Sequence, residues 1–251
     1  MSDTPLSGQI ALVTGASSGI GAATAARLAR AGADVAINVH ESDDGDDVAE
    51  RVREHGRRVV VIPADVGDED EVGRMFGRIA DELGPLGICV SNAGIQQAAP
   101  FVDTSFDSWR QQLAVNLDAT FLVGRAAARA MAGRGGGVII NVTSVHEHTT
   151  FPDHAPYCAA KAGAGMLTRC MARELASEGI RVLAVAPGAI LSGANEDSDG
   201  EGSQSGIPAG RLGRPEEVAE LICFLATPAA VYVSGTSIVI DGALEQEVST
   251  R

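Results

Sequence analysis

The chain has 251 residues, 45% of them hydrophobic, which predicts one large α/β domain over residues 1–251 with a sizeable core. Its 33 acidic residues against 19 basic ones give a formal net charge of -14, which disfavours nucleic acid and anionic membrane surfaces as partners. No run of about 18 apolar residues and no basic-to-apolar leader occurs, so we expect a cytoplasmic protein that does not span a membrane. The cysteines lack metal-ligand spacing and are predicted to be reduced thiols of the core: Cys89, Cys158, Cys170 and Cys223.

Short apolar segments alternate with helical periods along the chain. The first half predicts strands at 10–13, 35–37, 59–62 and 87–90 and helices at 22–31, 46–55 and 69–83. The second half predicts helices at about 106–132, at 155–178 and from Pro215 onward, and strands at 138–142, 182–185 and 237–240. Near-continuous apolar strands separated by helices indicate a parallel sheet covered on both faces.

One long irregular segment, 192–205, is rich in glycine, serine and acidic residues. Long loops in compact domains often close over a binding site, so this segment is a candidate substrate lid. A surface insertion without a binding role is the alternative.

A glycine-rich turn, 14–21, joins the first predicted strand to the first helix. The N-terminus of a helix carries partial positive charge and free N–H groups, which suit a pyrophosphate. Gly15 allows the tight turn, and Gly19 and Gly21 allow the backbone to approach a ligand and the sheet. The strand–turn–helix context therefore predicts dinucleotide binding. The residues expected at the cofactor are Gly15, Ser17, Ser18, Gly19, Ile20 and Gly21.

The end of the second predicted strand bears on which nicotinamide cofactor fits, because it meets the 2′ position of the adenosine ribose. An acidic residue there selects NAD, and a basic one favours the phosphate of NADP. Val39 stands at the expected strand end and His40 follows, which leaves room for a phosphate without a strong cation, while Glu41 opposes one. The sequence favours NADP or the use of both cofactors, and NAD stays open.

Two further strand ends suit the adenosine half of a dinucleotide. Asp65 and Val66 follow the third strand, where a carboxylate can accept a hydrogen bond from the adenine amino group. Asn92, Ala93 and Gly94 follow the fourth strand and offer small residues where a ribose can lie close. A solvated aspartate at a strand end is the alternative for Asp65.

Tyr157 and Lys161 lie four residues apart on a predicted helix, so their side chains share one face. A nearby ammonium favours the phenolate and lowers the pKa of a tyrosine from its usual value of about 10, so that it can exchange a proton with a substrate oxygen. Ser144, just after the fifth strand, adds a hydroxyl. Asn116 is a poor helix former within the long helix, where it predicts either a kink with a water on the freed carbonyl or a tolerated buried amide.

Motifs in a fixed order cover nearly the whole chain. They are Thr14-Gly15-x-x-x-Gly19-x-Gly21, Asn92-Ala93-Gly94, Asn116, Ser144, Tyr157-x-x-x-Lys161 and Pro187-Gly188. Together they resemble the short-chain dehydrogenase/reductase family. The resemblance implies a Rossmann-type doubly wound parallel seven-stranded sheet with helices on both faces, commonly assembled as a homotetramer.

The resemblance also implies a role for each motif. Tyr157 would be the general acid and base, Lys161 would lower its pKa and bind the nicotinamide ribose, and Ser144 would orient the substrate. Asn116 would hold the water of a proton relay. Besides the glycine turn, the residues expected along the cofactor are His40, Asp65, Val66, Asn92, Ala93, Gly94, Tyr157, Lys161, Pro187, Gly188, Ile190 and Ser192.

Finer detail is similar to glucose 1-dehydrogenases, notably the segments 144–147 and 187–190. Polar side chains there suit sugar hydroxyls, and a site built to bind hydroxyls rejects apolar analogues. The expected substrate contacts are Gln96, His146, Glu147 and Asn195. A local polar pair at the rim is the alternative for His146 and Glu147.

The leading hypothesis is an NAD(P)-dependent oxidoreductase that moves a hydride between nicotinamide C4 and a secondary alcohol or carbonyl of a small molecule such as a sugar. A reductase of 3-oxoacyl thioesters or other ketones is the alternative within the family. A protein that senses NADP without turnover ranks far behind, because the Asn-Ser-Tyr-Lys set is complete. The histidines and carboxylates of segment 146–154 lack helical ligand spacing, so no metal is expected.

Overall fold

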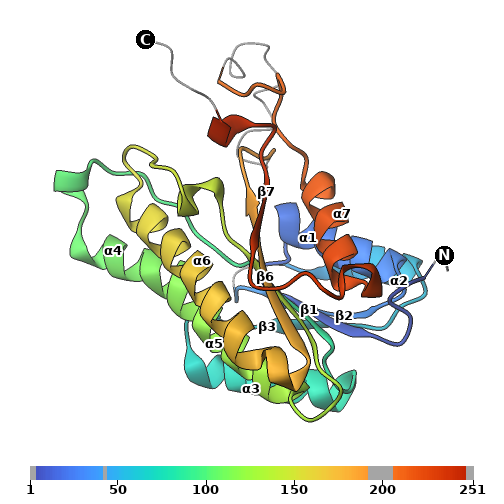
Figure 1. The fold of residues 1–251 in the computed structure, drawn as a ribbon. Helices are drawn as coiled ribbons and strands as arrows, with labels where there is room; N and C mark the ends of the chain where they lie inside the picture. Colours follow the sequence, from blue (N-terminus) through green and yellow to red (C-terminus); the bar gives the residue numbers. More distant parts are fainter. Residues whose placement is uncertain (1–3, 42–43, 192–205, 247–251) are drawn as a thin grey trace.

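The computed structural model describes residues 4–41, 44–191 and 206–246, and a single seven-stranded sheet runs through it (Figure 1). Neighbouring strands are parallel throughout, in the order β3-β2-β1-β4-β5-β6-β7. The strands are β1 (Ile10–Val13), β2 (Asp34–Val39), β3 (Val59–Pro63), β4 (Ile88–Ser91), β5 (Gly137–Val142), β6 (Ile180–Pro187) and β7 (Ser237–Ile240). The predicted fold class is confirmed, and each predicted strand overlaps an observed one.

Helices cover both faces of this sheet (Figure 1). One face carries α1 (Gly19–Arg30), α2 (Asp46–Glu54) and α7 (Pro215–Ala226), and the other carries α3 (Glu69–Glu82), α4 (Phe106–Leu113), α5 (Ala119–Met131) and α6 (Ala155–Leu175). Successive strand residues face opposite sides, so Ile139 and Ile140 of β5 belong to two separate apolar clusters. Within the described ranges, no helix is long and apolar enough to cross a bilayer.

The strand order reverses between β1 and β4, the two neighbours at the centre of the sheet. The loops that follow these two strands lead to opposite faces and leave a crevice at the carboxyl ends of the strands. This topology places the segments after β1 and β4 around one opening.

The long helix predicted at 106–132 is interrupted at the position of its asparagine. A π-helical segment, Ala114–Asp118, lies between α4 and α5. The N–H of Ala119 donates to the carbonyl of Ala114, one residue further back than in an α-helix. The widened turn contains Asn116, which is buried. Of the two alternatives that the sequence left open at Asn116, the structure shows the helix distortion.

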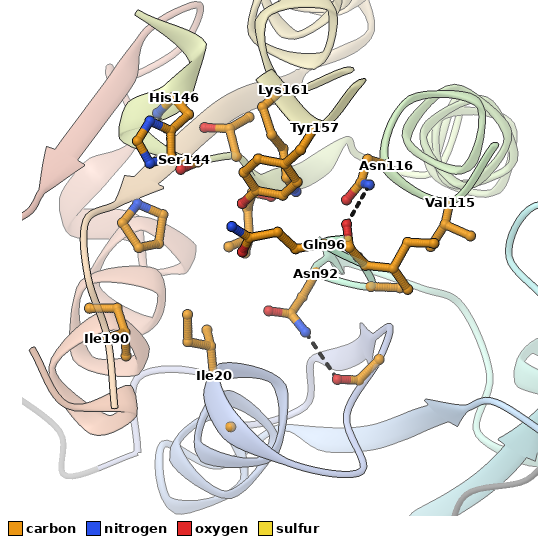
Figure 2. A pocket seen from close by; sticks show the side chains of 18 of the residues that line it. Ile20, Asn92, Gln96, Val115, Asn116, Ser144, His146, Tyr157, Lys161 and Ile190 are labelled. Atoms are coloured by element: carbon orange, nitrogen blue, oxygen red, sulfur yellow. Dashed lines mark hydrogen bonds between the residues drawn. The ribbon is translucent and has the colours of Figure 1, made fainter. Parts of the chain in front are cut away.

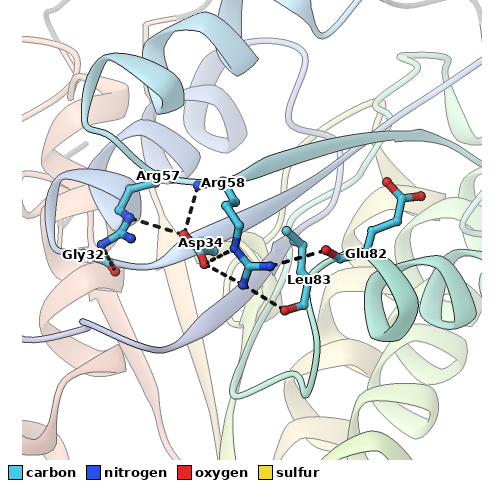
Figure 3. Close-up of polar contacts among 6 residues, drawn as sticks. All are labelled: Gly32, Asp34, Arg57, Arg58, Glu82 and Leu83. Carbon is cyan, nitrogen blue, oxygen red and sulfur yellow. Dashed lines mark hydrogen bonds and ion pairs between the residues drawn. The ribbon is translucent and has the colours of Figure 1, made fainter.

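A polar network fixes the amino end of β2, away from the crevice (Figure 3). The Asp34 carboxylate accepts hydrogen bonds from the backbone N and Nε of Arg58 at 3.0 and 2.8 Å and pairs with Arg57 Nε at 3.3 Å. Arg58 also donates to the carbonyls of Glu82 and Leu83 at the end of α3. Burial raises the pKa of Asp34, but the bonds and charges of the two arginines outweigh it and lower the pKa below its usual value.

All four cysteines are free, but the prediction that all are core thiols is wrong for α6. Cys89 and Cys223 are buried, whereas Cys158 is half-buried and Cys170 is exposed. Alanine, glycine and methionine occur all around α6, so its apolar pattern does not show which face is outside.

Candidate active site

A cleft of about 1480 Å³ opens at the β1–β4 reversal, at the carboxyl ends of the strands. Its walls come from the loops after the strands, from the π-helical segment and from α6. Most predicted site residues line it: Gly15, Ser17, Ser18, Gly19, Ile20, His40, Asp65, Val66, Asn92, Ala93, Gly94, Gln96, Asn116, Ser144, His146, Tyr157, Lys161, Pro187, Gly188 and Ile190. Ser192, Asn195 and the candidate lid at 192–205 lie outside the described residues.

Thr14 and Asn92 hold the glycine turn against the end of β4. The Thr14 hydroxyl oxygen accepts hydrogen bonds from the backbone N–H groups of Asn92 and Ala93, at 2.9 and 3.1 Å. Asn92 Nδ2 donates to the carbonyls of Thr14 and Gly15, at 2.9 and 3.0 Å. Gly15 has φ +59°, and a Cβ there would lie 2.7 Å from Ala93 Cα. Only glycine fits this position, as predicted.

The first turn of α1 opens into the cleft. Ser18 is the N-cap with extended backbone, and its side chain makes no capping bond. Gly19 has φ +54°, and a Cβ there would contact nothing within 4 Å. A helix N-terminus beside such open space suits a pyrophosphate. Gly21 does not line the cleft, because it is buried and a Cβ would collide with the Gly15 carbonyl and lie 2.7 Å from Asn92 Nδ2. Of the two close approaches predicted for its backbone, the structure shows the one within the fold. Gly21 packs the helix against the turn.

Asn38 is a positioning residue that the sequence analysis missed. Its buried side chain accepts a hydrogen bond from Gly15 N at 3.3 Å. Its amide group donates to the carbonyls of Val39, Ile62 and Ala64, at 3.2, 3.3 and 3.0 Å. One side chain therefore ties the glycine turn to the ends of β2 and β3. The signal in the sequence was a lone amide within an apolar strand.

His40, Asp65, Val66 and Asp68 line the cleft beyond the glycine turn. Val39 is buried in the core, so His40 is the first side chain after β2 to reach the cleft. No arginine of the described ranges lines the cleft, and its lysine lies at the other end. Within those ranges, His40 is the one side chain at this end that can carry positive charge.

Ser144, Tyr157 and Lys161 converge on one wall of the cleft (Figure 2). Lys161 Nζ lies 5.6 Å from the centre of the Tyr157 ring, one helical turn away on α6. Ser144 is buried just after β5, and its hydroxyl oxygen accepts a hydrogen bond from His146 N at 3.2 Å. The Ser144 hydroxyl lies near enough to the Tyr157 phenol to favour the phenolate. A hydroxyl, a phenol and an ammonium therefore meet, as the sequence predicted.

Burial raises the pKa of Tyr157 above its usual value, and the charge of Cys158 adds to this, while the nearby Ser144 hydroxyl opposes it. The sequence predicted the opposite direction, from the charge of Lys161. The two directions differ because burial disfavours the charged phenolate by more than the neighbouring groups stabilise it. Tyr157 is consequently a neutral phenol at pH 7, the form that donates a proton.

Lys161 is the single lysine among the 19 Lys and Arg residues of the chain. It is 5% exposed, and its Nζ donates a hydrogen bond to the Val142 carbonyl at 3.0 Å. Burial lowers the pKa of Lys161 to about 8, and the charge of Glu147 opposes this. The occurrence of a single lysine in the chain indicates that it has a specific role, and the sequence analysis did not use this signal.

Asn116 anchors the π-helical segment beside the same wall (Figure 2). Its Nδ2 donates hydrogen bonds to the carbonyls of Ile95 and Gln112, at 2.8 and 2.9 Å. The Asn116 carbonyl accepts a hydrogen bond from Thr120 Oγ1 at 3.0 Å. The buried Asn116 Oδ1 accepts no hydrogen bond from the described residues. The side-chain oxygen is therefore the acceptor that suits a water.

Aromatic rings and amides form the remaining wall, where a substrate would lie. His146 stacks on Phe151 with ring centres 4.6 Å apart, and Phe151 stacks on His154 at 4.1 Å. The His146 ring also lies edge-on to Tyr157, at 6.4 Å. Burial lowers the pKa of His146, and the neighbouring His154 adds to this. His146 is thus a neutral hydrogen-bonding group at pH 7.

Glu147 turns away from the cleft, so its prediction as a substrate contact is wrong. Ser144 caps a short 3₁₀ turn, Val145–Glu147, from which His146 faces the cleft. The Glu147 side chain is 1% exposed and lies against α6, with Oε1 2.8 Å from His148 Nε2. The turn sends adjacent residues in different directions, which spacing alone does not reveal.

The segment after β6 closes the cleft on the side of β7. Gly188 N donates a hydrogen bond to the Ile240 carbonyl at 3.0 Å, and a Cβ on Gly188 would lie 2.6 Å from Asp241 Cβ. Ile190 forms a bridge with Gly213 and reaches the cleft. Close packing here brings the backbone beside the space where a nicotinamide is expected.

Comparisons with known proteins agree with this geometry. Residues 15–244 match a family model described as enoyl-(acyl carrier protein) reductase. The chain is 41% identical to an uncharacterized oxidoreductase of Escherichia coli, with 93% of this chain and 94% of the relative covered. It is 42% identical to cis-4-hydroxycyclohexanecarboxylate dehydrogenase of Sinomonas cyclohexanicum, with 93% and 95% covered. A short-chain type dehydrogenase/reductase from Mycobacterium marinum superposes with a TM-score of 0.91 at 39% identity, over 96% and 98% of the two chains.

Further relatives differ in their named substrates. They include a 3-oxoacyl-[acyl-carrier-protein] reductase of Synechocystis at 39% identity and glucose 1-dehydrogenase 2 of Bacillus subtilis at 34%. The crystal structure of acetoin dehydrogenase from Enterobacter cloacae has a TM-score of 0.91 at 38% identity. The likeness to glucose 1-dehydrogenases is therefore one among several.

Proposed function

The chain belongs to the short-chain dehydrogenase/reductase family and is an oxidoreductase of that family, which uses NAD(P), and on this premise we propose that it interconverts a secondary alcohol and a ketone of a small neutral molecule. The observation that carries the proposal is the meeting of Ser144, Tyr157 and Lys161 on the wall of a cleft whose other end is the glycine turn. When bound, the nicotinamide supplies the hydride donor or acceptor at its C4 atom.

Tyr157 moves the proton that accompanies the hydride. Its neutral phenol donates a proton to a carbonyl oxygen during reduction, and its phenolate accepts one from an alcohol during oxidation. Because burial raises the pKa of Tyr157, the phenol form predominates at neutral pH and favours reduction there. Ser144, held by the N–H of His146, orients the substrate oxygen toward the phenol. Oxidation is expected to accelerate as the pH rises, up to the pH at which Lys161 loses its proton.

Lys161 and Asn116 support this proton transfer. The Lys161 ammonium, anchored on the Val142 carbonyl, holds positive charge beside the phenol and would bind a ribose hydroxyl of a cofactor in the same cleft. Asn116 Oδ1, buried and facing Gly94, binds the water that passes the proton onward. The π-helical turn is what brings this oxygen to the cleft.

The cofactor end supports binding of the pyrophosphate at the first turn of α1. Gly19 leaves open space there, and the uncapped helix N-terminus supplies N–H donors. For the adenosine ribose, the His40 imidazole can donate a hydrogen bond to a 2′-phosphate, while Asp65 and Asp68 favour an unphosphorylated ribose. These opposing features support use of both NADP and NAD.

The charges around the substrate end favour a neutral substrate. Among the described residues that line the cleft, the single fixed cation is Lys161, which is already bonded to a carbonyl, and Glu245 adds a carboxylate. The segment 192–205 contains four acidic residues and no basic one. Among the described residues at this end of the cleft, no free cation is present for a carboxylate or for the phosphate of a phosphopantetheine arm. Hydroxyls of a sugar, a polyol or a hydroxyketone suit Gln96, Ser144 and His146.

Reduced-nicotinamide absorbance tests the substrate and the cofactor together. Matched pairs separate charge from shape: D-glucose against gluconate, and cyclohexanol against cis-4-hydroxycyclohexanecarboxylate, with acetoin and a 3-oxoacyl thioester in the reducing direction. We expect the neutral member of each pair to have the higher kcat/KM by about tenfold or more. Faster turnover of the carboxylates or the thioester would reject the neutral-substrate proposal while keeping the reaction type.

We also propose that the chain forms a homotetramer. Large apolar side chains are exposed on two separate parts of the surface, with Phe106, Phe121 and Met166 on α4 to α6 and Phe224 and Tyr232 at or after α7. Two distinct self-complementary faces suit a tetramer with dihedral symmetry. Light scattering is expected to give four times the chain mass of 25.7 kDa, and a monomeric mass would contradict the proposal.

A further inference from the structure

Glu147 is a buried carboxylate that the reaction described above does not use. Its side chain is 1% exposed and does not line the cleft. It lies against α6 at Gly165, where a Cβ would be only 2.8 Å from Glu147 Oε2 and 3.4 Å from Oε1. Gly165 stands one helical turn beyond Lys161, about 6 Å along the axis. Glycine at this position therefore makes the room that the carboxylate occupies.

Burying a carboxylate is unfavourable unless other groups compensate its charge. Neither oxygen of Glu147 accepts a well-formed hydrogen bond from the described residues. Its near neighbour His148, with Nε2 at 2.8 Å, is partly exposed and is charged only when protonated. Besides His148, the group whose charge is coupled to Glu147 is Lys161, which lies one helical turn before Gly165 on α6.

Lys161 is likewise an ionisable group that is buried, but its charge is positive. It is 5% exposed, and its one hydrogen bond is to the Val142 carbonyl at 3.0 Å. Beside it lie the phenol of Tyr157 on α6 and the amide of Asn116 in the π-helical segment. Gly165, against which the Glu147 carboxylate packs, is one helical turn further along α6. Of the described groups, Glu147 is the one whose charge favours the ammonium, against burial that lowers the pKa of Lys161 to about 8.

We propose that Glu147, seated on Gly165, is a positioning residue that keeps Lys161 charged and thereby sets the upper pH limit of cofactor binding and turnover. The proposal rests on the proposed function for the part that concerns cofactor and turnover. The electrostatic pairing of Glu147 with Lys161 is independent of it. Loss of the carboxylate lets Lys161 lose its proton at a lower pH.

The single lysine allows a direct test. Protein labelled with ¹³Cε,¹⁵Nζ-lysine has one lysine side-chain signal, and its titration reports the pKa of Lys161 without assignment or turnover. In Glu147→Gln the midpoint should fall by about one unit or more, as expected when an opposite charge is lost. Glu174→Gln, which removes an exposed carboxylate from the same helix, is the matched control and should leave the midpoint unchanged. An unchanged midpoint in folded Glu147→Gln would overturn the proposal.

Gly165→Ala provides a second variant, should Glu147→Gln fold poorly. Its methyl group would displace the carboxylate from α6, so the Lys161 midpoint should again fall while Glu147 is retained. Fluorescence titration of reduced cofactor, repeated from pH 6 to 10, measures the consequence. We expect the alkaline loss of affinity to move by the same interval as the NMR midpoint and Glu147→Asp to restore part of it. A shifted midpoint with unshifted cofactor affinity would overturn the role of Lys161 in cofactor binding, while the pairing with Glu147 would stand.

Discussion

Replacing Lys161 by methionine is expected to stabilise the protein while abolishing its activity. Lysine and methionine have similar length, and Lys161 is 5% exposed, so methionine fills the same space without a buried charge. The pKa of Lys161 falls from 10.5 to about 8 on folding because burial disfavours the ammonium. The folded state therefore holds the charged lysine at a cost that an apolar side chain avoids.

The size of that cost follows from the shift. A change from 10.5 to about 8 corresponds to roughly 3 kcal/mol, at 1.36 kcal/mol for each pKa unit. Methionine also leaves the Val142 carbonyl without its hydrogen-bond donor, which lowers the stability of the variant by about 1 kcal/mol. The free energy of unfolding at pH 7 should then be about 2 kcal/mol higher for Lys161→Met than for the parent protein.

Urea unfolding followed by circular dichroism, between pH 7 and 10.5, measures this difference. Because the folded pKa lies below the unfolded one, the unfolded state binds more protons between these two values, and the parent gains stability as the pH rises through them. The advantage of Lys161→Met should be full below pH 8, should reach zero between about pH 9 and 10, and should reverse by about 1 kcal/mol near pH 10.5, where only the lost hydrogen bond to Val142 remains. A variant that is less stable than the parent at pH 7, or a difference that does not change with pH, would refute the reasoning.

Three further predictions concern residues that hold strands, the glycine turn and the first helix in place. Asp34→Asn should lower the free energy of unfolding at pH 7 by about 1–2 kcal/mol. Since the folded pKa of Asp34 is lowered, the difference should disappear in acid unfolding as the pH falls below 3.8. Asn38→Ala removes one hydrogen bond at the glycine turn and three at the ends of β2 and β3, and should cost about 2–4 kcal/mol in urea unfolding; a change below 0.5 kcal/mol would contradict it. Gly21→Ala should lower stability more than Gly73→Ala, an open helical position, in thermal unfolding, because only at Gly21 does a Cβ meet backbone.

The sequence predicted the parallel sheet and the order of strands and helices along the chain, because the strands are short apolar segments and the glycine turn at 14–21 is a local motif. It also left a helix distortion at Asn116 as one of two alternatives. The direction of the Tyr157 pKa could not be predicted, because it depends on how much water the folded chain excludes. The place of Glu147 was missed for a similar reason, since one 3₁₀ turn decides which side chain meets the cleft. The pairing of Glu147 with Gly165 joins residues of two elements and is visible only in the folded chain.

The most direct test of the central claim compares hydride transfer in the parent protein and in Tyr157→Phe, using the best substrate and cofactor of the panel. The phenyl ring fills the same site but has no proton to give, and general acid–base catalysis contributes about 10²–10⁴-fold. The account predicts that turnover falls by at least about 100-fold while reduced-cofactor binding, measured by fluorescence, stays within a few-fold. Turnover of Tyr157→Phe at the parent rate would contradict the account, and absence of turnover in both proteins would favour a protein that binds the cofactor without catalysis.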